Sequence, residues 1–430
     1  MKKIFNPTAS EWPEILKRPT QTIEDIEETV TQIFSEVKQK GDAAVAKYTE
    51  LFDGVKPINA RVSMGEVDNA ALEVSADLKK AIKLAKTNIE KFHAAQRTAR
   101  VEVTTSKGVK CWQEKRPIQK IGLYIPGGSA PLFSTILMLA APAALAGCKE
   151  IVLCTPPDKE GNVHPAILYT AQLCGITSIF KIGGIQAIAA MTFGTESVPK
   201  VYKIFGPGNQ FVTVAKQLAT RFSVAIDMPA GPSELLVVAD DSANASFVAS
   251  DLLSQAEHGA DSQVILVSAS RGLMDEVEKE IEIQLEELPR KEIAKKAIAN
   301  SKLIYLEDQE AALELINEYA PEHFIIAAEN EQFYSEGIYN AGSVFIGNYT
   351  PESAGDYASG TNHTLPTNAY ARQYSGVNLD SFMTAITFQK ISEEGIREIG
   401  PSIELMAEAE GLQAHKNAVS LRLEKLKRNK

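Results

Sequence analysis

Helical periodicity dominates the first hundred residues of the chain. In residues 22–38 apolar side chains recur mostly at intervals of three or four, acidic residues stand between them, and Gly41 follows as a helix stop. Residues 78–98 repeat this spacing. Both segments are typical of amphipathic helices that bury one face.

From residue 121 the pattern changes to short β-branched runs separated by helix-length or glycine-rich segments. The runs are 121–125, 151–154, 179–182, 201–205, 235–239, 264–267, 303–306, 324–327 and 344–346. This alternation predicts βαβ units around mostly parallel sheets, arranged as two α/β bodies. After residue 377 the pattern returns to helix, at 403–407 and 419–426.

Composition narrows the class of protein. The chain has 430 residues, enough for roughly three domains at about 150 residues each, and 44% of them are hydrophobic. The excess of acidic residues, with a net charge of -11, argues against binding to nucleic acid or to anionic membranes. No apolar run approaches the length of a membrane helix, and no apolar segment follows the first lysines. We therefore expect a cytoplasmic protein that acts on small molecules.

Three glycine-rich turns lie at the ends of predicted strands. They are YIPGGSAP (124–131), GGIQ (183–186) and GPGN (206–209). A strand, a glycine turn and a helix in succession bring backbone N–H groups towards a phosphate. The dinucleotide fingerprint GxGxxG is absent, so each turn alone is consistent with an ordinary tight turn. Together the three turns predict a ligand crevice.

Two pairs of residues are candidates for metal binding or proton transfer. Gln255 and His258 are three positions apart near the end of a helical stretch, so both side chains can reach one ligand, although a lone histidine there is also typical of a cap or a core. Glu322 and His323 precede an apolar strand and can supply two proton-transfer roles. Neighbours on a strand point to opposite faces, so joint action requires a bend in the backbone.

Further polar candidates lie towards the C-terminus. Asp356 and His363 fall in a long Gly/Ser/Thr/Asn loop, residues 350–369, and such loops are often functional. Glu410 and His415 lie in a helical segment, where a solvated helix face is the alternative interpretation.

Cysteine chemistry is a rival mechanism. A thiolate can attack an aldehyde to form a thiohemiacetal. The candidates are Cys111, Cys148, Cys154 and Cys174. Cys148 and Cys154 flank an apolar strand and Cys174 ends an apolar helix, which are settings of inert buried thiols.

Taken together, five segments resemble the histidinol dehydrogenase family along nearly the whole chain. They are 122–131, 203–209, 227–234, 251–259 and 320–323. The resemblance implies oxidation of L-histidinol through L-histidinal to L-histidine, with reduction of two NAD, and one zinc per active site of a homodimer.

The resemblance also implies a role for individual residues. The zinc ligands are Gln255, His258, Asp356 and His415. These four contact the substrate together with Ser233, His323, His363 and Glu410. The NAD contacts are Tyr124, Gln186 and Asn209. In this reading His323 takes the proton of the alcohol, and Glu322 activates the water that hydrates the aldehyde.

The implied architecture is two incomplete Rossmann-like domains, one inserted in the other, with small helical N- and C-terminal elements. The expected limits are 1–20 for an N-terminal extension, 21–123 with 235–377 for the first domain, 124–234 for the NAD-binding domain and 378–430 for a dimerisation tail. Glu410 and His415 in this tail are expected to complete the partner's site. Two alternatives stay open, namely an NAD-dependent dehydrogenase of another amino alcohol and a non-enzymatic zinc- or nucleotide-binding protein.

Overall fold

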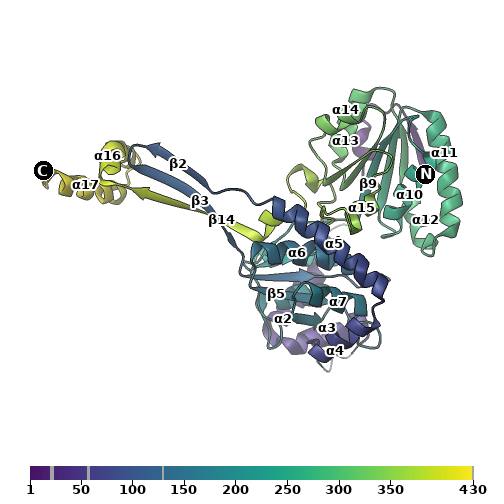
Figure 1. Cartoon of the computed structure of the whole chain (residues 1–430), viewed down its shortest axis with the longest axis horizontal. Coiled ribbons are helices and arrows are strands. Elements are labelled where there is room, and N and C mark those ends of the chain that lie inside the picture. Colours follow the sequence, from purple (N-terminus) through teal and green to yellow (C-terminus); the bar gives the residue numbers. More distant parts are fainter. Residues whose placement is uncertain (20–23, 56–58, 128–129, 429–430) are drawn as a thin grey trace. The chain divides into compact units, whose positions relative to one another are not determined.

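The computed structural model describes residues 1–19, 24–55, 59–127 and 130–428. These residues form two compact units. Unit 1 comprises Met1–Gln96 and Ile118–Ser381, and unit 2 comprises Arg97–Pro117 and Phe382–Lys430. Figure 1 shows the elements of both. The mixed α/β fold with parallel sheets, predicted from the spacing of apolar runs, is confirmed, and each predicted run contributes to a strand.

The larger sheet of unit 1 has six parallel strands in the order β1-β11-β10-β9-β12-β13. They are β1 (Lys2–Phe5), β9 (Glu234–Ala239), β10 (Gln263–Ser268), β11 (Lys302–Tyr305), β12 (His323–Ala327) and β13 (Ser343–Ile346). Every residue of β9, β10 and β12 is buried, because helices cover both faces of the sheet. The order of β9 to β13 is the 3-2-1-4-5 order of a doubly wound fold, with β1 added at the edge.

The helices of this sheet form two apolar layers. One layer contains α10 (Ala245–Ala256), α11 (Arg271–Glu287) and α12 (Lys291–Ala299). The other contains α1 (Trp12–Ile15), α13 (Gln309–Tyr319) and α14 (Glu331–Gly337). Figure 1 shows α13 and α14 on the side of β9 opposite to α11 and α12. The short helix α15 (Glu352–Tyr357) follows β13.

The second sheet of unit 1 has five parallel strands in the order β6-β5-β4-β7-β8, which is again 3-2-1-4-5. They are β4 (Lys120–Tyr124), β5 (Glu150–Thr155), β6 (Ser178–Lys181), β7 (Lys203–Phe205) and β8 (Ala225–Ile226). Their connecting helices are α6 (Phe133–Ala146), α7 (Pro165–Leu173), α8 (Gly184–Phe193) and α9 (Gln210–Thr220). Two Rossmann-like sheets are therefore present.

The N-terminal helices pack on this second sheet. They are α2 (Glu24–Lys40), α3 (Asp42–Asp53), α4 (Met64–Glu73) and α5 (Ala76–Ala95). Helix α2 contacts α8 and α9, and α5 contacts α6. The predicted domain limits assign residues 21–123 to the domain of the six-stranded sheet, whereas these helices pack on the five-stranded sheet. The domain limits stay a proposal. Residues 22–23 of the predicted helix 22–38 lie outside the described residues.

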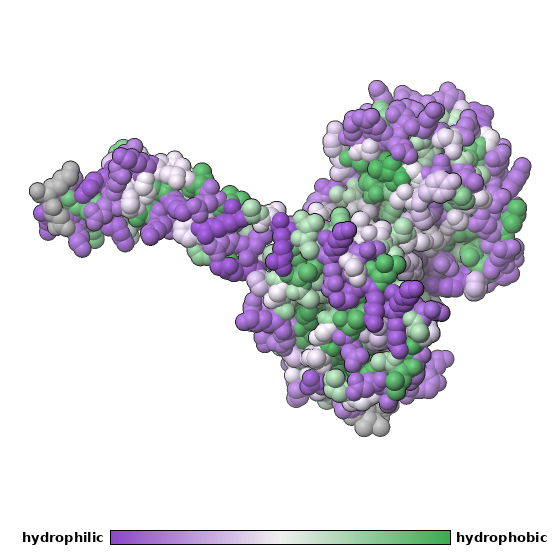
Figure 2. Space-filling model, in the orientation of Figure 1, coloured by the Kyte–Doolittle hydropathy of each residue, from purple (hydrophilic) through white to green (hydrophobic). Residues whose placement is uncertain are grey.

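Unit 2 contains an antiparallel sheet in the order β14-β3-β2 and two helices. Its elements are β2 (Val101–Ser106), β3 (Val109–Pro117), β14 (Met383–Ile391), α16 (Glu393–Ala409) and α17 (Gln413–Arg428). The return to helix after residue 377 is confirmed at 403–407 and 419–426, but the strand β14 that precedes these helices was not predicted. This strand has no buried residue, so it lacks the buried face by which apolar periodicity predicts a strand. Figure 2 shows apolar side chains interrupting the hydrophilic surface of unit 2.

Among the helices of the described segments, none is both long enough and apolar enough to span a lipid bilayer.

Candidate active site

The predicted acid/base pair lies at the amino edge of the six-stranded sheet. His323 is the first residue of β12, where it pairs with Leu235 of β9 and with Ser343 of β13. Glu322 directly precedes it. In most open parallel sheets ligands bind at the carboxyl ends of the strands, so this site uses the opposite edge.

The side chains of Glu322 and His323 lie close together although the two residues are neighbours in the chain. Helix α13 ends at Tyr319, the next residue Ala320 has a left-handed conformation with φ of 51°, and β12 begins at His323, so Glu322 precedes the strand. Oε2 of Glu322 lies 3.6 Å from Nδ1 of His323. The proximity that joint action requires is present.

The backbone of Glu234, the first residue of β9, orients three predicted site residues. Its N–H group donates to Oε2 of Glu322 at 2.9 Å. Its carbonyl oxygen accepts from Nε2 of Gln255 at 3.1 Å and lies 3.2 Å from Nδ1 of His323. Nε2 of Gln255 also lies 3.4 Å from Oε2 of Glu322. These contacts turn Oε1 of the Gln255 amide away from Glu234.

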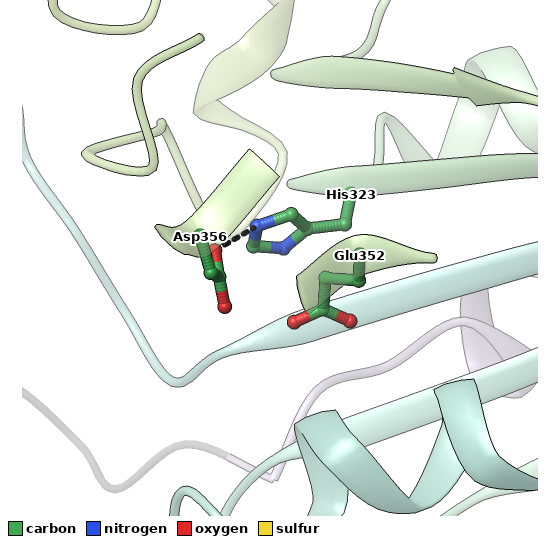
Figure 3. Close-up of side chains that lie close together, drawn as sticks. All are labelled: His323, Glu352 and Asp356. Atoms are coloured by element: carbon green, nitrogen blue, oxygen red, sulfur yellow. Dashed lines mark ion pairs between the residues drawn. The ribbon is translucent and has the colours of Figure 1, made fainter. Parts of the chain in front are cut away.

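A carboxylate cluster faces the other side of the His323 ring. Nε2 of His323 lies 3.7 Å from Oδ1 of Asp356, and ligand atoms of His323, Glu352 and Asp356 all lie within 4.8 Å of one another. Figure 3 shows these three side chains gathered around one space. The prediction that Asp356 lies in a loop is wrong, because residues 352–357 form α15.

Glu352 is a site residue that the sequence analysis missed. It lies one helical turn before Asp356, so the two carboxylates project from the same face of α15. That spacing is visible in the sequence, but it predicts a shared face only if the segment is helical.

The polar atoms of this cluster fit a divalent cation. Oε1 of Gln255, Nε2 of His323 and both carboxylate oxygens of Glu352 are buried and have no hydrogen-bond partner among the residues that the structure describes. Each such group costs about 1–3 kcal/mol unless something satisfies it. The imidazole and carboxylate donors around this space, with the amide of Gln255 beside the His323 ring, form a set that zinc accepts.

Electrostatics support the same interpretation. Burial raises the pKa of Glu352 well above its usual value. Burial acts in the same direction on Asp356, but the His323 imidazole 3.7 Å away and the charges of His363 and His258 outweigh it and lower the pKa of Asp356. Several buried carboxylates with few cations beside them favour a positive ion in the space between them.

His258 lies next to this cluster but not on the helix that carries Gln255. Helix α10 ends at Ala256, and His258 is an exposed residue in the turn that follows, with its N–H bonded to the carbonyl of Gln255 at 3.2 Å. His258 therefore lies beyond the helix that carries Gln255, and the prediction that both side chains reach one ligand stays a prediction. The charge of His258 contributes to the lowered pKa of Asp356.

His363 connects the cluster to the five-stranded sheet. Its Nδ1 lies 2.9 Å from the carbonyl oxygen of Asp356, and its Nε2 lies 3.0 Å from Oγ1 of Thr135 in α6. Burial lowers the pKa of His363. Ser233, another predicted substrate contact, directly precedes β9 and is half-buried.

The predicted NAD contacts lie at the carboxyl edge of the five-stranded sheet, around the point between β4 and β7 where the strand order reverses. Tyr124 ends β4, and its hydroxyl accepts from the N–H of Gly184 at 3.1 Å. Gln186 is fully buried, and neither polar atom of its amide has a hydrogen-bond partner in the described part of the chain. Asn209 caps α9 by accepting from the N–H of Val212 at 3.1 Å.

A cavity of about 630 Å³ opens beside this edge. Its lining includes Gly127, Pro131, Pro156 and His164. Gly128 and Ser129, the centre of the predicted YIPGGSAP turn, lie outside the described residues.

A buried ion pair that the sequence analysis missed braces the GPGN turn. Nζ of Lys216 lies 2.5 Å from Oδ1 of Asp227 and donates to the carbonyl of Gly206 at 2.8 Å. Oδ2 of Asp227 accepts from the N–H of Gly206 at 2.8 Å. Gly206 has φ of 131°, and a Cβ there would meet the carbonyl oxygen of Tyr124, so this position requires glycine.

Glu410 and His415 belong to unit 2. Glu410 directly follows α16 and His415 lies in the first turn of α17, and both are exposed. The other predicted site residues belong to unit 1.

The cysteines are poorly suited to nucleophilic attack. Burial raises the pKa of Cys148 to about 11 and that of Cys174 to about 12. Cys154 is fully buried in β5, and burial raises its pKa further. Cys111 lies in β3 of unit 2. None of the four thiols belongs to the cluster around His323.

Comparison with known proteins identifies the family. The model of the family described as histidinol dehydrogenase matches residues 16–423. Histidinol dehydrogenase from Bacteroides thetaiotaomicron is 60% identical over 427 residues, covering 99% of this chain and 100% of the relative. That from Haemophilus influenzae is 53% identical over 413 residues, or 96% of each chain.

A solved structure agrees with these sequence matches. The crystal structure of histidinol dehydrogenase from Elizabethkingia anophelis has a TM-score of 0.97 and 58% identity, covering 99% of each chain. An acetylating aldehyde dehydrogenase from Geobacillus thermoglucosidasius shares the fold alone, with a TM-score of 0.50 and 13% identity over 88% of this chain and 93% of the other. The chain belongs to the histidinol dehydrogenase family.

Proposed function

We propose that this protein is an NAD-dependent, zinc-containing dehydrogenase that oxidises L-histidinol to L-histidine through L-histidinal. The observation that carries the proposal is the buried set of unpartnered donor atoms on Gln255, His323 and Glu352 beside the acid/base pair, in a chain of this family. The relatives are named for this substrate.

Gln255, His258 and Asp356, with His415 of the partner subunit, would hold the zinc. A bound zinc would serve as a template that positions the imidazole and amino groups of the substrate. Ser233 and His363, with Glu410 of the partner subunit, would make further substrate contacts. The unpartnered Oε1 of Gln255 and the lowered pKa of Asp356 support this assignment.

His323 acts as the base in the first oxidation. Nδ1 of His323 lies 3.2 Å from the Glu234 carbonyl oxygen and 3.0 Å from Nε2 of Gln255, and these contacts orient the ring. Nε2 faces the carboxylate cluster and has no hydrogen-bond partner among the described residues. This atom takes the proton of the alcohol as hydride leaves to the first NAD.

Glu322 acts in the second oxidation. An aldehyde must add a nucleophile before it can release a hydride at the oxidation level of an acid, and the settings of the cysteines favour water over a thiol. Glu322 takes a proton from this water, and the resulting hydrate gives its hydride to a second NAD. The N–H of Glu234 holds the carboxylate in position.

The residues at the carboxyl edge of the five-stranded sheet would bind NAD. Tyr124, Gln186 and Asn209 surround the point where the strand order reverses, and the unpartnered amide of Gln186 offers a donor and an acceptor. The cavity beside Gly127 and Pro156 gives room for part of the dinucleotide.

The proposed assembly is a homodimer in which residues 378–430 form the dimerisation tail. The exposed apolar side chains of this tail support it. They include Ile386, Ile391, Leu405, Met406, Leu412 and Leu421. Domain limits near 20, 123, 234 and 377 and a cytoplasmic location belong to the same proposal.

The test follows NADH absorbance with L-histidinol before chelation, after chelation and after zinc is added back. We expect NADH formation that chelation abolishes and zinc restores. Amino alcohols without an imidazole should react far more slowly. Equal rates with such alcohols would instead indicate a dehydrogenase of another amino alcohol, and zinc binding without NADH formation would contradict the proposed function.

A further inference from the structure

A buried arginine outside the catalytic cluster touches two elements of the site framework. Arg18 follows α1, and its guanidinium binds the Glu234 carboxylate with two nitrogens: Nη2 lies 2.9 Å from Oε2, and Nε bonds to Oε1. The Arg18 side chain is 11% exposed and that of Glu234 is fully buried. The pair therefore has the bidentate geometry that fixes orientation.

Arg18 also holds the segment that leads into the acid/base pair. Its Nη2 donates to the carbonyl oxygen of Tyr319 at 2.6 Å, and its guanidinium lies 4.1 Å from the centre of the Tyr319 ring. Tyr319 ends α13, and the left-handed Ala320 comes next, followed by Pro321, Glu322 and His323. One side chain thus contacts the start of β9 and the turn before β12.

The segment around Arg18 is itself fixed at the same edge of the sheet. Gln263, the first residue of β10, donates from Nε2 to the carbonyl of Lys17 at 3.0 Å and accepts from the hydroxyl of Tyr319 at 3.1 Å. The Glu234 carboxylate also accepts from the N–H of Asn368 at 2.7 Å. Arg18 therefore cannot shift without disturbing this network.

We propose that Arg18 is a positioning residue for the acid/base pair. It acts through Glu234, whose backbone bonds to Glu322, His323 and Gln255, and through the carbonyl of Tyr319. Loss of Arg18 removes the common anchor of these two backbones, so Glu322 and His323 lose their alignment. The inference rests on the proposed function for its kinetic readout.

The first experiment compares R18M and R18K with the control R372M in the full-length zinc-loaded protein. Arg372 is a suitable control because it is exposed and donates to the carbonyl of Glu318, one residue before the carbonyl that Arg18 holds. We expect R18M to lower kcat for both histidinol and histidinal about 10- to 100-fold, since a displacement of about 1 Å costs up to about 100-fold. R18K should fall between R18M and wild type, because one ammonium cannot replace a bidentate guanidinium.

The KM for NAD distinguishes a local loss of alignment at the acid/base pair from a general loss of protein structure. The predicted NAD contacts lie on the other sheet, so this KM should stay within about twofold of the wild-type value. Wild-type kcat in folded R18M overturns the inference, as does an equal loss in R372M.

A second variant separates positioning from stability. R18M leaves Glu234 buried without its counter-ion, which lowers the thermal midpoint, whereas R18M/E234M removes both charges and should recover much of the midpoint. The kcat should stay low in the double variant because the bond to Tyr319 is still absent. Recovery of kcat together with stability would show a merely structural role and overturn the inference.

A crystal structure of the double variant gives a readout that does not depend on activity. Movement of the Glu322 carboxylate by about 1 Å from the N–H of residue 234 supports the inference, because that is the scale at which alignment fails. An unchanged hydrogen bond overturns it. Absence of histidinol oxidation by the wild-type protein would contradict the proposed function alone, and this structure would still decide the role of Arg18.

Discussion

Glu352 and Asp356 lie one turn apart on the same face of α15, with their carboxylates directed to the space beside Nε2 of His323. Both oxygens of Glu352 are buried without a hydrogen-bond partner in the described residues. A second carboxylate beside a proposed zinc ligand adds negative charge where the cation would bind.

We therefore expect Glu352→Gln to weaken zinc binding about 10- to 100-fold, the usual effect of removing a polar neighbour of metal ligands. Competition with a fluorescent chelator measures the affinity. Glu331→Gln is the matched control, because Glu331 occupies the first turn of α14 as Glu352 does that of α15, but is exposed. Unchanged zinc affinity in Glu352→Gln would show that this carboxylate does not influence the metal.

Glu322→Gln separates the two oxidations. The amide still accepts a hydrogen bond from the N–H of Glu234 but cannot take a proton from water. Oxidation of histidinal should slow by about 100- to 10,000-fold, the range typical of general acid–base catalysis, while oxidation of histidinol to the aldehyde slows much less. Single-turnover measurements with each substrate provide the comparison. Equal slowing of both steps at normal zinc content contradicts the role assigned to Glu322.

Removal of the cysteines tests the rival mechanism. Burial raises the pKa of Cys148 and Cys174, and no thiol belongs to the cluster. A variant with serine at positions 111, 148 and 174 and alanine at 154 should keep kcat for histidinal within about threefold, although it should be less stable because it loses buried sulfur atoms. Trapping of a thioester intermediate in the wild-type protein would instead support a cysteine nucleophile.

The Lys216–Asp227 pair provides a test of the NAD site. Lys216→Met leaves the Asp227 carboxylate buried without its ion-pair partner, so it should destabilise the protein by about 3–5 kcal/mol. It should also raise the KM for NAD, because Gly206 loses a partner beside Tyr124. Denaturant unfolding and NAD titration measure the two effects. Lys120→Met, which removes a surface ion pair with Glu150 in the same sheet, should change neither.

A mixture of two inactive variants tests the shared site. His415→Ala removes a proposed ligand supplied to the partner, and His323→Asn removes the base. A heterodimer that carries one variant in each chain should contain one site with both lesions and one intact site, and so recover up to half of the activity. No recovery in purified heterodimers would place His415 in the site of its own chain.

Most strands of the two large sheets could be predicted from the sequence because their burial produces short β-branched runs, but β1 and β8 were not predicted. Strand β14 could not be predicted, since it has no buried residue. Glu322 and His323 were identified as neighbours in the chain, but the contacts that orient them come from Glu234, which is distant in the sequence.

Contacts between residues that are far apart in the sequence were the hardest feature to predict. Glu352 became interpretable only once residues 352–357 were seen to be helical. Arg18 is 216 positions from its partner Glu234, and no local pattern links them. The ion pair of Lys216 and Asp227 likewise joins a helix to a residue that no local sequence pattern links to it.

The number of NADH molecules formed per molecule of L-histidinol tests the central claim most directly. The proposed site carries out both oxidations, through His323 and then Glu322, so exhaustive conversion of a limiting amount of histidinol should yield two NADH and L-histidine. One NADH per histidinol, with histidinal as the final product, would contradict it.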